Sequence, residues 1–234
     1  MVGNNTTPPI QTSHQRRMKL SLLKNSAIMD ADELSLFRWY VIETEILHEK
    51  MYSEELQLVD KQDIESASYN DSGLVAVRYF TKRSRYSHII YLASLGEKYL
   101  SDSCRKLSTA LGDNVIFGLD EIKGNGWIKE RKFMQRYGNF EIPNDLWERF
   151  STIYFVRNAL VHENGEVTAF NDHERAELRN KCARAQGVSV EGSELEIKPE
   201  FVESCVNALQ EFMVFLDGKL GGVIERSIKP RSVT

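Results

Sequence analysis

Residues 87–104 read SHIIYLASLGEKYLSDSC and carry the most regular helical pattern of the chain. With their neighbours they place apolar side chains at steps of three and four, the spacing of one face of an α-helix. One carboxylate, Glu97, interrupts this face, and Gly112 follows its end, where a left-handed residue often stops a helix. We expect a core helix whose buried stripe comprises Tyr86, Ile90, Ala93, Glu97, Leu100, Cys104, Leu107 and Leu111.

Helical patterns on both sides of this stretch predict an all-α fold. A long N-terminal helix is expected to start at Asp30 or Asp32, either of which can cap it, and to end near residue 64. Residues 66–73 (SASYNDSG) read as a turn-rich break. Residues 188–197 alternate around Gly192 and are a candidate for one small β-hairpin. Further helices are predicted over residues 127–137, from Asn144 or Asp145 to just before Gly165, over residues 172–186, and from Pro199 to about residue 226.

These elements predict one helical domain over residues 26–226. Residues 1–25 are expected to be a disordered or weakly ordered tail, because the first part of this segment is rich in Asn, Thr and Pro. Residues 227–234 are expected to be a C-terminal tail. A chain of 234 residues can bury a full core without disulfides or metals.

Composition limits the classes of partner and compartment. The net charge of -4 argues against a general polyanion-binding surface, so any RNA contact would come from a local basic patch. The cysteines Cys104, Cys182 and Cys205 are odd in number and widely spaced, which favours small core residues in a reducing compartment. No stretch has the apolar length of a signal peptide or a membrane span. We therefore expect a cytoplasmic protein that does not insert into membranes.

The candidate chemistry lies in the segment RNALVH, from Arg157 to His162. Arg157 falls on the apolar side of its predicted helix, where an arginine needs a partner or an anionic ligand. His162 follows in the last turn, and imidazole is well suited to proton transfer near neutral pH. The chain has no glycine-rich phosphate loop, no spaced set of metal ligands and no nucleophile-elbow serine. An Arg for the phosphate and a His for the proton suffice for RNA cleavage without a metal or cofactor.

The spacing of this pair points to two copies of the chain. Five residues on an ideal helix separate Arg157 and His162 by about 140°, so one helix does not aim both at one point unless its end redirects His162. A two-fold dimer would bring two such helices to a shared cleft. The spacing alone is weak support, because Arg83 and His88 share it. We interpret Arg83 as a surface residue and His88 as a packing or surface residue.

The wider context of the segment, VRNALVHENG, resembles the HEPN superfamily, a group of small helical proteins of higher eukaryotes and prokaryotes. Its motif is an Arg, four to six residues and a His, often with Asn directly after the Arg. Residues 87–104 also resemble the earlier helix of the family, in which an acidic residue lies in an apolar row. The resemblance covers roughly residues 83–220, and only the motif region is specific.

The resemblance implies an all-α homodimer with metal-independent endoribonuclease activity, often a toxin or an effector of anti-phage defence. It implies that Arg157 and His162 are the catalytic pair and that Asn158 supports them by hydrogen bonding. An antitoxin or another regulatory protein is an implied partner. Glu97 would face the site or pair with Arg157, an expectation that depends more on its place in the apolar stripe.

Simpler roles stay open for each of these residues. Arg157 and Glu97 would form a structural ion pair, His162 would only stabilise its helix end, and Asn158 would be a polar surface residue. In a non-catalytic module, the same helices would bind a partner protein or RNA. A basic segment interleaved with aromatic residues is the candidate RNA-binding surface, because stacking and charge together bind single strands. Its candidate residues are Arg78, Lys82, Arg83, Arg85 and Tyr86.

Overall fold

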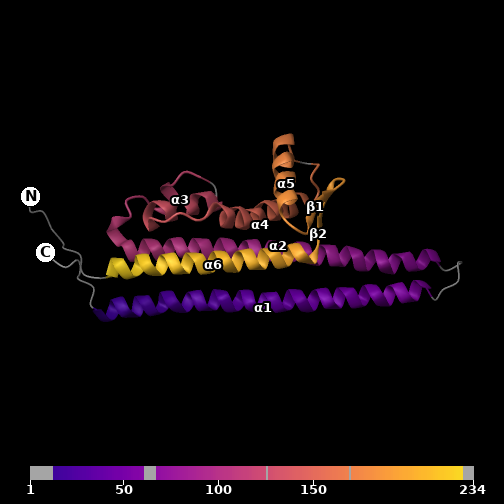
Figure 1. The fold of residues 1–234 in the computed structure, drawn as a ribbon, viewed down its shortest axis with the longest axis horizontal. Helices are drawn as coiled ribbons and strands as arrows, with labels where there is room; N and C mark the ends of the chain where they lie inside the picture. The colour runs from indigo at the N-terminus through magenta and orange to yellow at the C-terminus, as the bar shows by residue number, and fades with distance from the viewer. Residues whose placement is uncertain (1–12, 61–66, 125, 169, 229–234) are drawn as a thin grey trace, which may run out of the picture.

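The computed structural model describes residues 13–60, 67–124, 126–168 and 170–228 (Figure 1). These ranges hold six α-helices, two short 3-10 turns and one pair of strands, which confirms an all-α fold with a small hairpin. The elements are α1 (Ser13–Asp60), α2 (Ala67–Leu111), η2 (Gly112–Asn114), η3 (Leu119–Glu121), α3 (Gly126–Gly138), α4 (Asn144–Glu163), α5 (Asp172–Arg184), β1 (Val188–Glu191), β2 (Glu194–Ile197) and α6 (Pro199–Ile228).

Three long helices, α1, α2 and α6, lie side by side along the molecule (Figure 1). The helices α3 and α4 cover the side of α2 and α6 that faces away from α1, and α5 stands across them beside the hairpin. All six α-helices and the hairpin contribute side chains to one contiguous core. The central helix α2 contacts α1, α3, α4 and α6, so it is buried around most of its circumference.

The burial of α2 is wider than the stripe predicted for it. Tyr86, Ala93, Leu100, Cys104 and Leu107 are buried as predicted, whereas Ile90, Glu97 and Leu111 are only half-buried. The residues Ile89, Leu92, Leu95 and Tyr99 are buried as well. A single stripe is what a helix at the edge of a bundle shows. The additional buried residues reflect the central position of α2.

Two expected helix boundaries are wrong. The helix α1 begins at Ser13, inside the expected tail, and runs through the predicted caps Asp30 and Asp32 without interruption. The helix α2 begins at Ala67, inside the expected turn-rich break. Packing of the two helices against each other outweighs the low helix propensity of that stretch. Residues 1–12 and 229–234 of the expected tails lie outside the described residues.

The contact between α1 and α2 extends to the start of α2. Gly73 abuts the carboxylate of Glu55, so a larger residue there would require the Glu55 side chain to move. Four residues later on α2, Val77 is buried, and next to it Arg78 donates from Nη2 to Oη of Tyr52 at 2.8 Å. These contacts show how tertiary packing extends α2 beyond its best-patterned part.

The C-terminal half follows the sequence closely. The strands β1 and β2 pair antiparallel with Val188 opposite Ile197, and the turn between them places Gly192 at a φ of 62°. Cys104, Cys182 and Cys205 are free and buried, as expected for core residues. None of the described helices combines the length and hydropathy needed to cross a membrane.

Candidate functional site

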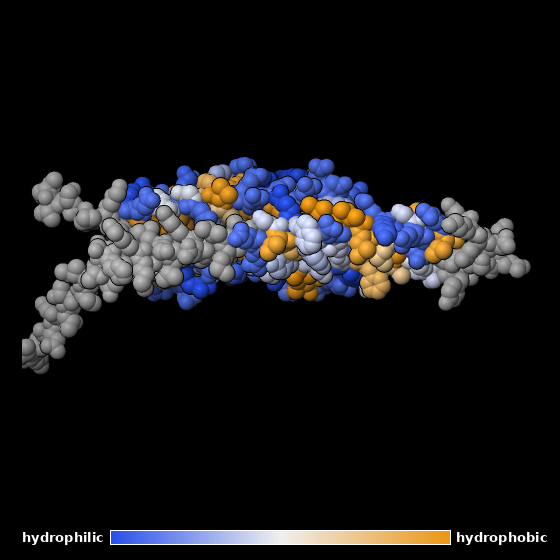
Figure 2. Space-filling model, turned by 90° about the horizontal axis from the view of Figure 1, so that it is seen from below, coloured by the Kyte–Doolittle hydropathy of each residue, from blue (hydrophilic) through white to orange (hydrophobic). Residues whose placement is uncertain are grey.

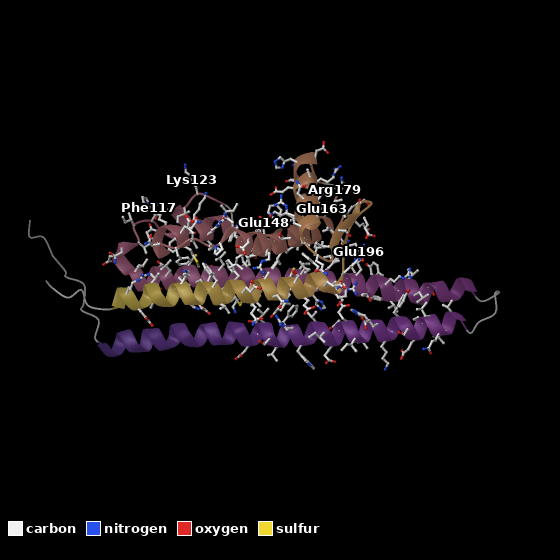
Figure 3. The ribbon with its side chains drawn as sticks, viewed as in Figure 1. Phe117, Lys123, Glu148, Glu163, Arg179 and Glu196 are labelled. Atoms are coloured by element: carbon white, nitrogen blue, oxygen red, sulfur yellow. The ribbon has the colours of Figure 1, made fainter. Side chains whose placement is uncertain are left out.

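The segment from Arg157 to His162 forms the last two turns of α4, which runs antiparallel to α2. Gly96 of α2 abuts the ring of Phe150 near the start of α4, and Tyr86 abuts Gly165 just past its end. The buried face of α4 is the predicted one, comprising Leu146, Phe150, Ile153 and Leu160. In Figure 3, the labelled Glu163 at the end of α4 lies near the foot of α5 and near Glu196 of the hairpin, whereas Glu148 lies farther toward α3.

Arg157 is a half-buried cation without a carboxylate partner among the described residues. Its Nη1 donates a hydrogen bond of 2.9 Å to Oδ1 of Asn158. Its Nε is buried and has no hydrogen-bond partner among the described residues. A guanidinium that is partly desolvated and unpaired favours an anionic ligand, because such a ligand supplies the missing charge and acceptors.

Glu97 does not pair with Arg157. No ion pair or hydrogen bond joins the two within the described part of the chain. Arg157 lies seven residues beyond Phe150, the residue level with Gly96, and this corresponds to about 10 Å along α4 in the direction away from Glu97. The expected pairing of Glu97 with the motif arginine is therefore wrong.

Glu97 instead lies beside a second carboxylate, Glu130 of α3. The pKa of Glu130 is raised to about 7, mainly by burial and next by the charge of Glu97, while a hydrogen bond with Ser101 opposes the shift. Because a carboxyl with such a pKa is partly protonated at neutral pH, it can adjoin another carboxylate at low cost. The acidic residue in the apolar row of α2 thus belongs to the contact between α2 and α3.

His162 is exposed in the last turn of α4 and makes no hydrogen bond or ion pair with the described residues. Helical periodicity places its side chain about 140° from that of Arg157, with Asn158 between the two directions. Asn158 precedes His162 by four residues, so both lie on neighbouring positions of one face. The imidazole is accessible for proton transfer with a bound molecule.

The end of α4 is held by α2 and the hairpin. Asn164 adopts the left-handed conformation with a φ of 54°, and Gly165 follows with a φ of 86°. Arg83 donates from Nη1 to the backbone oxygen of Asn164 at 3.2 Å and to its side-chain oxygen. A Cβ at Gly165 would lie 2.6 Å from Oη of Tyr86, so only glycine fits there. The backbone N–H of Leu195 donates to the oxygen of Gly165 at 2.8 Å.

The sequence named Arg83 as a surface residue and a candidate for RNA binding, but it did not predict that Arg83 binds the end of the motif helix. Arg83 binds the carbonyl end of this helix, where a cation is favourable. Its guanidinium also lies over the rings of Tyr79 and Tyr86. Arg83 and His88 therefore do not form one site, because Arg83 contacts the end of α4 whereas His88 is buried between α1 and α2.

The basic segment of α2 connects three parts of the fold. Lys82 donates to Oε2 of Glu194 at 2.5 Å, and this bond lowers the pKa of Glu194. Arg85 binds both carboxylate oxygens of Glu45, at 2.9 Å and 2.7 Å. Two of the four expected RNA-binding cations are thus engaged by carboxylates.

The other three expected RNA-binding residues form no ion pair with a carboxylate among the described residues. Arg78 bonds the Tyr52 hydroxyl, and Arg83 bonds Asn164. Tyr86 is buried, and its hydroxyl donates to the backbone oxygen of Leu195 at 2.5 Å. The uncompensated positive charge of this region therefore comes from Arg78 and Arg83, together with Arg157 on α4.

The described residues contain no group of His, Cys, Asp or Glu side chains arranged to hold a metal ion. No family model, curated protein or solved structure matches the chain.

Proposed function

We propose that the chain is a metal-independent endoribonuclease that works as a homodimer with Arg157 and His162 as its catalytic pair. The observation that carries the proposal is the state of Arg157, which is half-buried, oriented by Asn158 and free of any carboxylate among the described residues. A structural ion-pair arginine would contact an acid. An exposed imidazole on the same helix end supplies the second group that the reaction needs.

The reaction would proceed by attack within the RNA chain. His162 accepts the proton of a ribose 2′-hydroxyl while the 2′-oxygen forms a bond to the adjacent phosphorus. Arg157 binds the phosphate oxygens, on which negative charge increases. The bond from phosphorus to the 5′-oxygen breaks, and this oxygen takes a proton from the His162 of a second copy. The products are a 2′,3′-cyclic phosphate and a 5′-hydroxyl, with no water consumed.

Asn158 has a positioning role in this proposal. Its Oδ1 accepts the hydrogen bond from Arg157, and it lies on the helix face shared with His162. Arg83 would bind an RNA phosphate near the end of α4, and Arg78 would bind one closer to α1, because neither is paired with a carboxylate among the described residues. In the cell, the activity would act on cytoplasmic RNA, as a toxin or anti-phage effector held in check by an antitoxin or another regulatory protein.

An RNA cleavage assay in EDTA tests the proposal. The wild type should cleave RNA to 2′,3′-cyclic phosphate ends, and Arg157→Ala and His162→Ala should each lose about 100-fold or more in rate. Arg179→Ala and His173→Ala on the exposed helix α5 are matched controls and should cleave at the wild-type rate. Cleavage by His162→Ala at the wild-type rate would refute the assignment.

The non-catalytic alternative predicts a different result in the same assay. A helical module that binds RNA or a partner protein would show no cleavage at any concentration of the wild type. That module would be supported if the wild type binds RNA without cleaving it and Arg157→Ala binds RNA more weakly. The exposed apolar residues of α1 are the observation that favours binding through helices.

A further inference from the structure

The outward face of α1 carries a regular apolar stripe. Its residues are between 40% and 69% exposed and form two interleaved series, each with an interval of eleven residues. The first series is Leu36, Leu47 and Leu58, and the second is Tyr40 and Met51. Eleven residues complete three turns at 3.67 residues per turn, so the stripe runs nearly straight along the helix. From Leu36 to Leu58 it extends about 33 Å. We call these five residues the α1 stripe.

The α1 stripe faces mostly away from the bundle; of its residues, Tyr40 also reaches α2, where its ring lies 5.5 Å from that of His88. The opposite face of α1 supplies the contacts with the bundle, through the buried residues Leu34, Val41 and Glu45. Arg38 also bonds Asn207 and Gln210 of α6, at 2.6 Å and 2.9 Å. Figure 2, which views the molecule from the α1 side, shows hydrophobic residues along the described part of this helix. Contiguous apolar surface of this kind marks an interaction site.

A second apolar row flanks the stripe on the side toward α6. Trp39, Ile42 and Ile46 are more than half exposed there. Ile42 and Ile46 border a groove of about 220 Å³ between α1 and α6, whose other wall includes Val206. The face thus offers a ridge and an adjacent groove, which is the surface that another helix needs for ridges-into-grooves packing.

Two independent features of α1 share one centre. The midpoint between Leu36 and Leu58, the ends of the stripe, is residue 47. Among the exposed charges of this part of α1, Glu43 and Lys50 have their midpoint between residues 46 and 47; Lys50 also lies 3.9 Å from Glu54 of its own helix, a highly exposed pair. A two-fold axis at this point would place Glu43 of one copy opposite Lys50 of the other, with Leu47 near the axis and the stripe ends opposite each other.

We infer that α1 pairs antiparallel with α1 of a second copy of this chain, about an axis between Ile46 and Leu47. A parallel pair would instead place Glu43 against Glu43 and Lys50 against Lys50, which is repulsive. The antiparallel pair is isologous and therefore closed, so it does not propagate into filaments through this face.

This interface is separate from the proposed nuclease site. The layer of α2 and α6 lies between α1 and α4 (Figure 1). Pairing through α1 therefore does not bring two Arg157–His162 segments to one cleft. If both contacts form with perpendicular, intersecting two-fold axes, the assembly is a closed tetramer, and loss of the α1 contact leaves a dimer. The inference goes beyond the proposed function and does not depend on it.

The first test is the molar mass of the full chain, measured by light scattering during size-exclusion chromatography at micromolar concentration. Leu47→Glu should halve the mass of the wild type, because it buries a carboxylate at the axis. Ile128→Glu, which changes an equally exposed apolar residue on α3, should leave the mass unchanged. Circular dichroism should show wild-type helicity for both variants, since both residues are exposed.

The second test separates a second copy of this chain from another helical partner. Glu43→Lys and Lys50→Glu should each lower the fraction of the larger species, and the double variant should restore it, because the reversed charges again face each other. A monomeric wild type, or an unchanged mass in Leu47→Glu, overturns the inference. If both single variants lower the fraction of the larger species and the double variant does not restore it, the antiparallel register is overturned. An RNA cleavage assay of Leu47→Glu then reports on the nuclease proposal independently.

Discussion

Arg157 donates a hydrogen bond from Nη1 to Oδ1 of the adjacent Asn158 at 2.9 Å, and no carboxylate pairs with it among the described residues. An amide acceptor orients a guanidinium without neutralising its charge. The positive charge thus stays available to an anion, which an Arg157–Glu97 ion pair would have prevented. The adjacency of Arg and Asn in the sequence therefore has a direct structural meaning.

Asn158→Ala should slow RNA cleavage by about tenfold, equal to about 1.4 kcal/mol of barrier, because Arg157 loses the acceptor that orients it. The effect should fall on kcat more than on KM, and it should be smaller than that of Arg157→Ala. Asn158→Asp should keep the orientation but pair the charge, so it should weaken RNA binding. Kinetics of both variants beside the wild type distinguish a positioning role from a surface role, for which kcat would stay unchanged.

Gly165→Ala should lower the free energy of unfolding by about 2 kcal/mol. The new Cβ would face Oη of Tyr86 at 2.6 Å, and the backbone has a φ of 86°. Gly192→Ala is the matched control, because its φ of 62° is also positive but no atom lies within 4 Å of the added Cβ. It should cost about 1 kcal/mol, from the backbone alone. If urea denaturation shows the same decrease in the free energy of unfolding for Gly165→Ala and Gly192→Ala, a steric role for Tyr86 is contradicted.

Removing Arg85 should destabilise the attachment of α1. Arg85 and Glu45 are mostly buried, with side-chain exposures of 17% and 12%, and they share two hydrogen bonds. Arg85→Ala leaves the Glu45 charge unpaired and should cost about 3 kcal/mol, with faster amide exchange in α1. The double alanine variant should cost less than the sum of the single variants. Arg105→Ala, which removes an exposed pair with Asp102, should change stability by less than about 0.5 kcal/mol.

His88 should make stability depend on pH. Both of its ring nitrogens are buried without hydrogen-bond partners among the described residues, and burial lowers its pKa from the ordinary value of 6.5. Glu45 opposes this shift, whereas His48 and Arg85 add to it. The unfolded chain binds the proton near pH 6.5 and the folded chain only at lower pH. The stability is therefore complete above pH 6.5 and decreases as the pH falls below it, by up to about 1.4 kcal/mol per pH unit.

His88→Leu should flatten this dependence, because an apolar residue of similar size has no proton to bind. Chemical denaturation at a series of pH values from 5 to 8 measures the slope for both proteins. His173→Leu, at an exposed position of α5, should keep the wild-type slope. A His88→Leu slope equal to that of the wild type would show that another group is responsible.

Local sequence signals predicted the parts of the fold that local physics controls. The helix from Asn144 ends at a left-handed Asn164 and Gly165, as the glycine after the apolar run predicts. The hairpin over β1 and β2 follows from alternation around Gly192, which supplies the positive φ of its turn. The helical spacing from Tyr86 to Leu107 placed α2 in the core. In each case, the cause lies within a few residues of the effect.

The partners of individual side chains were decided by the tertiary structure. The sequence could not show that Arg83 would bind Asn164, since these residues are 81 positions apart and meet only when α4 packs antiparallel along α2. It also could not show that Glu97 would adjoin Glu130, because the direction of a half-buried side chain depends on which helices surround it. The contact between α1 and α2 likewise outweighs the low helix propensity of the stretch in which α2 begins, at Ala67.

By itself, the sequence determined the helical class, the end of α4 and the positions of Arg157, Asn158 and His162, since periodicity, capping and spacing are local properties of the chain. Only the tertiary structure decided that Arg157 has no acidic partner in the described part of the chain, that Arg83 holds the end of its helix, and that α1 presents an exposed apolar stripe. The physical reason is that charge compensation and burial depend on atoms from distant parts of the chain, which a one-dimensional pattern does not specify.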